Sequence, residues 1–272
     1  MSEATTTHGR STFPSTGAVT IFEQWWRPVG EPRAVLAICH GYAEHSSRYE
    51  HVAQHLAAHR YAVEALDLRG HGHSSGERVE IRGYDEYHDD LGLFLDRVRG
   101  RNTGRKLFLL GHSMGGGVVT SFVLARRPEL DGLLLSGAGM LGPRPLPDPN
   151  APPPAPLPAS SVSRDPAVVA AYESDPLIYH GPPKPNRLAA SQAAYDLVQR
   201  EMHTISSPLL IMHGTGDLLV PYRGSEVLYE RAISTDKTLK LYDGLYHEIL
   251  NEPERLTVLA DIVGWLEART GS

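Results

Sequence analysis

The stretch Gly111-His112-Ser113-Met114-Gly115 decides the fold of this chain. It lies between an apolar run, residues 106–110, and a stretch of small and apolar residues, 116–127, that is typical of a helix. A serine with a glycine two residues before it and another two residues after it, at a strand-to-helix turn, is typical of a nucleophile elbow. The glycines are needed because the strand and helix backbones approach too closely there for side chains. The strained turn directs the hydroxyl into open space. The sequence therefore predicts that Ser113 is a nucleophile.

A second pentapeptide of the same form, Gly72-His73-Ser74-Ser75-Gly76, shows that the pattern alone is not decisive. With 26 glycines in 272 residues, a chance match is not rare. The context separates the two, because Ser74 follows the polar turn 67–71 and no apolar helix leads out of it. We therefore interpret Ser74 as a loop serine.

Short apolar runs alternate with helical segments along most of the chain. The runs comprise residues 34–39, 62–66, 107–110, 132–135, 209–212 and 238–242, after an early antiparallel strand at 18–27. The helix candidates comprise residues 49–58, 84–99, 116–127, 225–232 and 253–268. Strands that are apolar throughout and separated by helices predict an α/β fold, a mostly parallel sheet with helices on both faces. In such sheets the functional site lies at the carboxyl ends of the strands.

The segment 139–205 interrupts this alternation. Nine of the 17 residues from Gly142 to Pro158 are proline, which excludes a helix and predicts an extended segment. Two short helices are expected after it, at 166–173 and 187–202. Since the segment lies between two core strands, we expect an inserted lid above the site rather than a linker. The core then comprises residues 1–138 and 206–272.

Composition excludes several classes of function. The net charge of −6 is mixed along the chain, so no nucleic-acid partner is expected. Residues 1–14 are polar, so no signal peptide is expected. No apolar run approaches the roughly 18 residues of a membrane span. We therefore expect a cytoplasmic location. The single cysteine, Cys39, lies in an apolar run and predicts a buried, inert thiol. Among the 14 histidines, the trio His71, His73 and His88 does not have the spacing of metal ligands, so neither a metal nor a cofactor is expected.

Two loops after strands supply the partners that a serine nucleophile needs. A histidine must accept the hydroxyl proton, and a carboxylate must orient that histidine. Asp217 follows the run 209–212, and His247 follows the run 238–242. The order Ser113, Asp217, His247 is the one expected for a nucleophile elbow of this kind.

Other polar residues near these motifs receive supporting roles. Asp67 also follows a strand, but it precedes the nucleophile and continues into a glycine-rich loop, so we interpret it as structural. His213 is expected to support the acid loop. His112 adjoins Ser113 but its side chain is expected to point elsewhere, and His40 is expected to anchor its own loop.

Backbone N–H groups are expected to stabilise the oxyanion. One donor is Met114, which follows the nucleophile at the start of a helix, where the helix dipole also favours negative charge. The other is Tyr42, in the loop after residues 34–39, where Gly41 allows the backbone to turn inward.

At these residues the chain closely resembles the bacterial and mammalian monoacylglycerol lipases, a lidded branch of the α/β-hydrolases. The matching segments are 40–49, 67–74, 111–116, 174–177, 213–217 and 246–248. The resemblance covers about residues 18–269 and implies an eight-stranded type of sheet, helices on both faces and an inserted lid. It implies a serine hydrolase without a cofactor that cleaves monoacylglycerols to fatty acid and glycerol through an acyl-enzyme. Weak peripheral membrane contact through the lid is also implied.

The resemblance also implies contacts with the glycerol hydroxyls by Glu44 and Arg48, and by Tyr172 from the lid. The alternative for Glu44 and Arg48 is a salt bridge that holds the oxyanion loop. Two features depart from the family. The proline-rich segment replaces an apolar lid helix, which predicts a shortened, more open lid, and Leu250 stands where mammalian members have a polar histidine.

Other functions stay open at this point. The same chemistry could serve a broader carboxylesterase acting on short-chain, aromatic or alkyl monoesters or on lysophospholipids. A cofactor-free perhydrolase uses the same three residues, and a non-catalytic binding protein could share the scaffold. Epoxide hydrolases and haloalkane dehalogenases are set aside, because their elbow carries an aspartate where this chain has Ser113.

Overall fold

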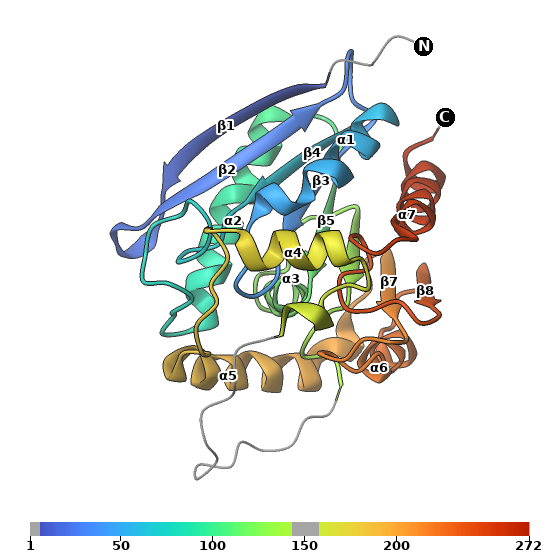
Figure 1. The fold of residues 1–272 in the computed structure, drawn as a ribbon. Helices are drawn as coiled ribbons and strands as arrows, with labels where there is room; N and C mark the ends of the chain where they lie inside the picture. Colours follow the sequence, from blue (N-terminus) through green and yellow to red (C-terminus); the bar gives the residue numbers. More distant parts are fainter. Residues whose placement is uncertain (1–5, 143–157, 272) are drawn as a thin grey trace.

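An eight-stranded, twisted sheet forms the centre of the molecule (Figure 1). The computed structural model describes residues 6–142 and 158–271. The strand order is β1-β2-β4-β3-β5-β6-β7-β8. The strands are β1 (Thr7–Pro14), β2 (Thr20–Arg27), β3 (Ala34–Cys39), β4 (Tyr61–Leu66), β5 (Lys106–His112), β6 (Gly132–Ser136), β7 (Leu209–Gly214) and β8 (Lys237–Tyr242). Strand β2 pairs antiparallel with β1 and β4, and all other neighbours are parallel. The predicted mostly parallel α/β sheet is therefore confirmed.

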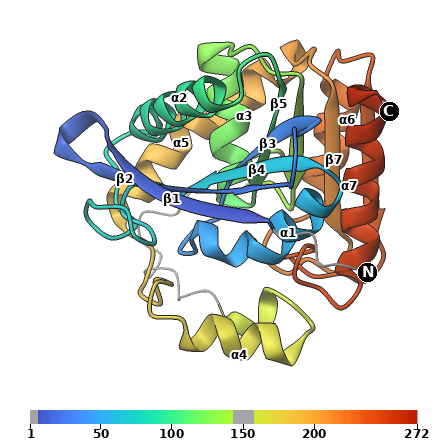
Figure 2. The ribbon, with the colours of Figure 1, turned by 90° about the horizontal axis from the view of Figure 1, so that it is seen from above.

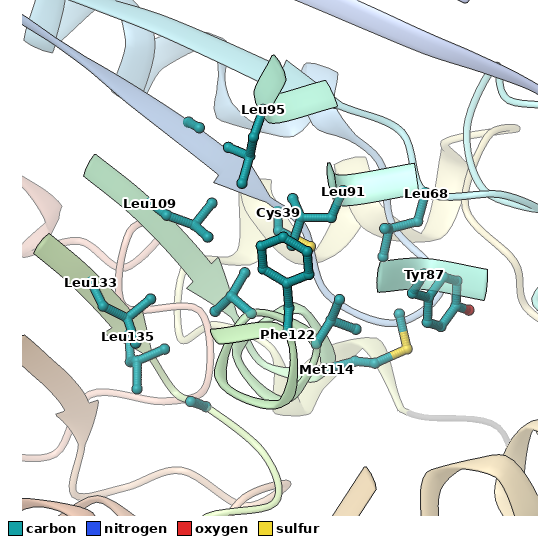
Figure 3. Close-up of a cluster of buried hydrophobic side chains, with 14 of the residues drawn as sticks. Cys39, Leu68, Tyr87, Leu91, Leu95, Leu109, Met114, Phe122, Leu133 and Leu135 are labelled. Carbon is teal, nitrogen blue, oxygen red and sulfur yellow. The ribbon is translucent and has the colours of Figure 1, made fainter. Parts of the chain in front are cut away.

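Helices cover both faces of this sheet (Figure 2). They are α1 (Glu50–Ala58), α2 (Tyr84–Arg101), α3 (Met114–Arg126), α4 (Pro166–Ser174), α5 (Pro185–Glu201), α6 (Arg223–Arg231) and α7 (Arg255–Thr270). Side chains of β3 alternate between two separate cores. Val35, Ala37 and Cys39 pack with α2 and α3 (Figure 3), whereas Leu36 and Ile38 pack with α1 and α7. This period of two is what a strand with both faces covered requires.

The two edge strands differ from the sequence expectations. Strand β1 was missed, because residues 7–14 are polar and only Phe13 among them is buried. Strand β8 was expected to be apolar throughout, but its side chains are half-buried or exposed, since it forms the opposite edge of the sheet. Edge strands lack a covering layer and can therefore carry polar residues.

The two helices of the predicted insertion occupy different places. Helix α4 begins at Pro166, where the Asp165 side chain accepts a hydrogen bond from the Ala167 N–H and caps the helix. Helix α5 buries Ala190, Ala194 and Val198 in the same core as α3. Thus α5 is a covering helix of the core, whereas α4 lies apart from the helix layers (Figure 2).

Most of the expected proline-rich segment, residues 143–157, lies outside the described residues. We call residues 159–181, which contain a short helical turn and α4, the cap. The boundaries of the insertion at 139–205 stay a prediction. Along the described parts of the chain, the helices are all too short or too polar to cross a membrane.

Candidate active site

The turn from β5 to α3 has the geometry of a nucleophile elbow. Ser113 lies between the two elements with φ 51° and ψ −119°, a conformation that is costly for a residue other than glycine. A Cβ atom on Gly115 would lie 2.3 Å from the carbonyl oxygens of Cys39 and His40, and one on Gly111 would lie 2.4 Å from a methyl group of Val119. The glycines are therefore required by close backbone approach, as the sequence predicts.

Ser113, His247 and Asp217 form a continuous chain of hydrogen bonds. Nε2 of His247 lies 2.7 Å from Oγ of Ser113, and Nδ1 lies 2.7 Å from Oδ2 of Asp217. An ionised carboxylate accepts hydrogen bonds but cannot donate them, so the Nδ1–H group of His247 must donate to Asp217. The lone pair of Nε2 then faces the Ser113 hydroxyl. This arrangement can withdraw the proton of Ser113 as its oxygen attacks.

Asp217 is buried but remains easy to ionise. Burial opposes its ionisation, but hydrogen bonds from His213 and His247 outweigh that effect and hold the pKa of the carboxyl well below its usual range. The N–H groups of Leu219 and Val220 donate to Oδ1 at 2.8 and 2.9 Å. The acid is therefore a preformed carboxylate.

His213 holds the acid from the side opposite to His247. Its Nε2–H group lies 3.0 Å from Oδ2 of Asp217, and its Nδ1 accepts from the Ser225 hydroxyl at 2.7 Å. The expectation that His213 supports the acid loop is confirmed by these contacts. The ring is fully buried, so it orients the carboxylate without contact with solvent.

The loop after β3 lies directly against the nucleophile. A Cβ atom on Gly41 would lie 3.2 Å from Cβ of Ser113. The Gly41 N–H donates to Oε1 of Glu44 at 2.6 Å, and Nε2 of His40 accepts from the Leu68 N–H at 2.9 Å. The expected anchoring role of His40 is confirmed by that bond. We call residues 40–45 the oxyanion loop, since it carries Tyr42, an expected oxyanion donor.

The two expected oxyanion donors each follow directly in sequence one of the two residues in contact, Gly41 and Ser113. Tyr42 directly follows Gly41, and Met114 is the first residue of α3. An N–H group in the first turn of a helix has no partner within the helix and is free to bind an anion.

The expected substrate contacts Glu44 and Arg48 are ion-paired in this structure. Arg48 donates to Oε2 of Glu44 at 2.8 Å and to both oxygens of Glu248 at 2.6 and 2.7 Å. Burial opposes ionisation of Glu44, but Arg48 and nearby groups lower the pKa of its carboxyl to about 2. The ring of Tyr172 lies 5.0 Å from the Arg48 guanidinium. The salt-bridge alternative therefore describes this cluster, and Glu248 is a member that the sequence did not single out.

The cap closes over the oxyanion loop through polar contacts. The Tyr179 N–H donates to the carbonyl oxygen of Ala43 at 2.9 Å, and Nε2 of His45 lies 2.9 Å from Oδ2 of Asp175. A cavity of about 180 Å³ lies between the two segments. Its lining comprises Tyr42, Ala43, Ala159, Tyr172, Glu173, Tyr179, His180 and Gly181.

Ser74 and Asp67 have structural roles in the loop that follows β4. Ser74 is buried and donates to the carbonyl oxygen of Asp67 at 2.6 Å, so it is a structural loop serine. Asp67 accepts from the N–H groups of Ser46 and His73, which confirms its structural role.

Within residues 6–142 and 158–271, the structure brings together no set of three or more side chains suited to hold a metal ion.

Comparison with known proteins identifies similar chains over nearly the full length. A family model described as serine aminopeptidase, S33, matches residues 30–254. The chain is 37% identical to a monoacylglycerol lipase of Mycolicibacterium smegmatis, over 96% of this chain and 97% of that protein. It is 32% identical to a monoglyceride lipase of Homo sapiens, over 93% and 88%. The crystal structure of a Paleococcus ferrophilus monoacylglycerol lipase has a TM-score of 0.77 at 26% identity, covering 97% of this chain and 99% of that one.

Proposed function

Because this chain belongs to the monoacylglycerol lipase branch of the serine aminopeptidase S33 family, we propose that it hydrolyses monoacylglycerols to fatty acid and glycerol. The observation that carries this proposal is the hydrogen-bonded chain from Ser113 through His247 to Asp217, on an elbow that exposes the serine. Hydrogen-bonded serine, histidine and aspartate residues can perform several reactions. Similarity to monoacylglycerol lipases over nearly the full length favours ester hydrolysis among them.

In the proposed first half of the reaction, Oγ of Ser113 attacks the ester carbonyl carbon while Nε2 of His247 takes its proton. The carboxylate of Asp217 stabilises the resulting imidazolium. The N–H groups of Tyr42 and Met114 donate to the carbonyl oxygen as it becomes negative. When the ester C–O bond breaks, His247 gives its proton to the glycerol oxygen, and the acyl group remains on Ser113.

In the proposed second half, water replaces glycerol. His247 removes a proton from the water as its oxygen attacks the acyl carbon, and the same two N–H groups stabilise the oxyanion. Breakage of the bond to Ser113 releases the fatty acid, and His247 returns the proton to Oγ. Neither half of the reaction needs a group beyond these side chains and N–H groups.

Hydrolysis of a series of monoacylglycerols tests the proposal. Release of glycerol and fatty acid is measured for chains from short to long, beside alkyl and aromatic esters of the same acids. A higher kcat/KM for the glycerol esters is expected. No release from any monoacylglycerol would refute the proposal, and a uniform preference for the other esters would make the protein a broader carboxylesterase.

We also propose that the cap contacts lipid surfaces weakly. The outer face of α4 exposes Ala167, Ala170 and Ala171, and no charged residue lies between Pro166 and Tyr172. These small side chains bury little apolar area, so binding should be weak and reversible. Sedimentation with phosphatidylcholine vesicles tests this, and cell fractionation tests the cytoplasmic location that the sequence predicts.

A further inference from the structure

Arg48 lies where the oxyanion loop and the loop of His247 meet. It lies two residues before the start of α1 at Glu50, and it pairs with Glu44 in the oxyanion loop and with Glu248 next to His247. The Arg48 side chain is 10% exposed, and the side chains of Glu44 and Glu248 are 4% and 6% exposed. The Arg48 guanidinium therefore joins two loops, one with the proposed oxyanion donor Tyr42 and one with the proposed general base His247.

We propose that Arg48 is a positioning residue, which fixes the oxyanion loop and the His247 loop relative to each other. The inference rests on the proposed ester hydrolysis by Ser113. It assigns Arg48 and Glu44 a different task from glycerol contact, and it gives Glu248 a role.

A continuous path of short contacts links Arg48 to the oxyanion loop. Oε1 of Glu44 accepts from the Gly41 N–H at 2.6 Å and from the Tyr49 hydroxyl at 2.8 Å, while Oε2 accepts from Arg48. The Gly41 peptide adjoins Tyr42, whose N–H is the proposed donor to the oxyanion. Arg48 is thus linked to the Tyr42 N–H through the Glu44 carboxylate and the Gly41 peptide.

A second path links Arg48 to the general base. Glu248 directly follows His247 and binds Arg48 through both of its oxygens, in the two-pronged geometry that a planar guanidinium favours. The Asn251 amide also donates to Oε2 of Glu248 at 2.9 Å. The backbone that carries His247 is thereby tied to the same cation as the oxyanion loop.

The charged groups of the cluster are all paired within the protein. Each oxygen of Glu44 and Glu248 already accepts a hydrogen bond within the protein, and the ring of Tyr172 covers the guanidinium. The ion pairs therefore need no glycerol hydroxyl to balance their charges. Positioning of the loops is therefore the function that the geometry favours over binding of the alcohol.

The Arg48→Lys variant tests the proposal with two substrates. Lysine keeps the positive charge but cannot hold two carboxylates with a planar fork. One substrate is a monoacylglycerol, and the other is p-nitrophenyl acetate, which has no glycerol group. We expect kcat to fall by about 10²-fold for both esters with little change in KM, because a misplacement of about 1 Å costs that much.

Arg101→Lys is the matched control. Arg101 also bridges two buried glutamates, Glu23 and Glu64, but they lie on β2 and β4, away from Ser113. Both variants lose an ion-pair bridge of the same type, so a comparable fall in Tm is expected. Only Arg48→Lys should lower kcat, measured at a temperature where circular dichroism shows both variants folded.

Two results would overturn the proposal. One is a rise in KM for the monoacylglycerol alone with unchanged turnover of p-nitrophenyl acetate, which would make Arg48 a glycerol contact. The other is a kcat for Arg48→Lys no lower than that of Arg101→Lys. If Arg48→Lys does not fold, Glu248→Gln is read by the same criteria, since it removes one charge of the cluster. Wild-type turnover of p-nitrophenyl acetate without turnover of monoacylglycerols would refute the proposed substrate and leave this test intact.

Discussion

His247 and His213 share a single oxygen atom, Oδ2 of Asp217, at 2.7 and 3.0 Å. One imidazole faces Ser113, and the other is fully buried behind the acid. The carboxylate is thus held between a histidine that exchanges protons in the proposed reaction and one that only orients it.

Asp217→Asn should lower kcat by about 10⁴-fold, because an amide no longer selects the required imidazole tautomer. Steady-state hydrolysis of a monoacylglycerol measures this effect, and circular dichroism checks the fold. A loss below tenfold would mean that another group orients His247.

The effect of His213→Gln should be smaller, because this residue acts on His247 only through Asp217. Loss of one hydrogen bond to a charged group predicts a fall in kcat of about tenfold. The same assay measures it, with Asp217→Asn as the reference. A fall as large as that of Asp217→Asn would show that His213 takes a direct part in proton transfer.

The low pKa of Asp217 predicts how stability depends on pH. Because its folded-state pKa lies below the unfolded value of about 3.9, the ionised carboxyl stabilises the fold fully above that value. The contribution is lost as the pH falls toward the folded pKa. Urea unfolding of the wild type and Asp217→Asn from pH 7 to pH 3 should show the stability difference shifting against the wild type below about pH 4. A pH-independent difference would contradict this account.

Gly115→Ala should destabilise the protein, because the new methyl group would lie 2.3 Å from two carbonyl oxygens. Overpacking of this kind costs typically about 1–3 kcal/mol. The control is Gly264→Ala in α7, where a Cβ atom meets nothing within 4 Å and the helix should gain up to about 1 kcal/mol. Thermal unfolding measures both variants, and equal Tm values would contradict the close approach at the elbow.

The thiol of Cys39 should not react in the folded protein. Burial raises the pKa of this thiol far above its usual range, and nearby acidic groups add to the shift. Iodoacetamide at pH 8 is expected to label Cys39 only after denaturation, as measured by intact mass. Rapid labelling of the native protein would show that the core around β3 opens readily.

The parts of the site that depend on local sequence could be predicted. The glycines around Ser113 identify the elbow, because the close approach that requires them occurs within one turn of chain. The placement of Asp217 and His247 in the loops after two neighbouring parallel strands follows from the rule that the site lies where such strands end. The family resemblance inferred from these motifs is confirmed by the similarity to monoacylglycerol lipases over nearly the whole chain.

The parts that depend on distant partners could not be predicted. Glu248 was not singled out, because its partner Arg48 lies 200 positions earlier and an ion pair leaves no periodic pattern. Strand β1 was missed because its pairing with β2, rather than burial of apolar side chains, makes it a strand.

Turnover of a monoacylglycerol by the wild type and by Ser113→Ala tests the central claim most directly. We predict that the wild type releases fatty acid and glycerol, and that Ser113→Ala loses on the order of 10⁶-fold in kcat. The variant should retain the circular dichroism spectrum and Tm of a folded protein. Turnover by a folded Ser113→Ala variant close to that of the wild type would contradict the account.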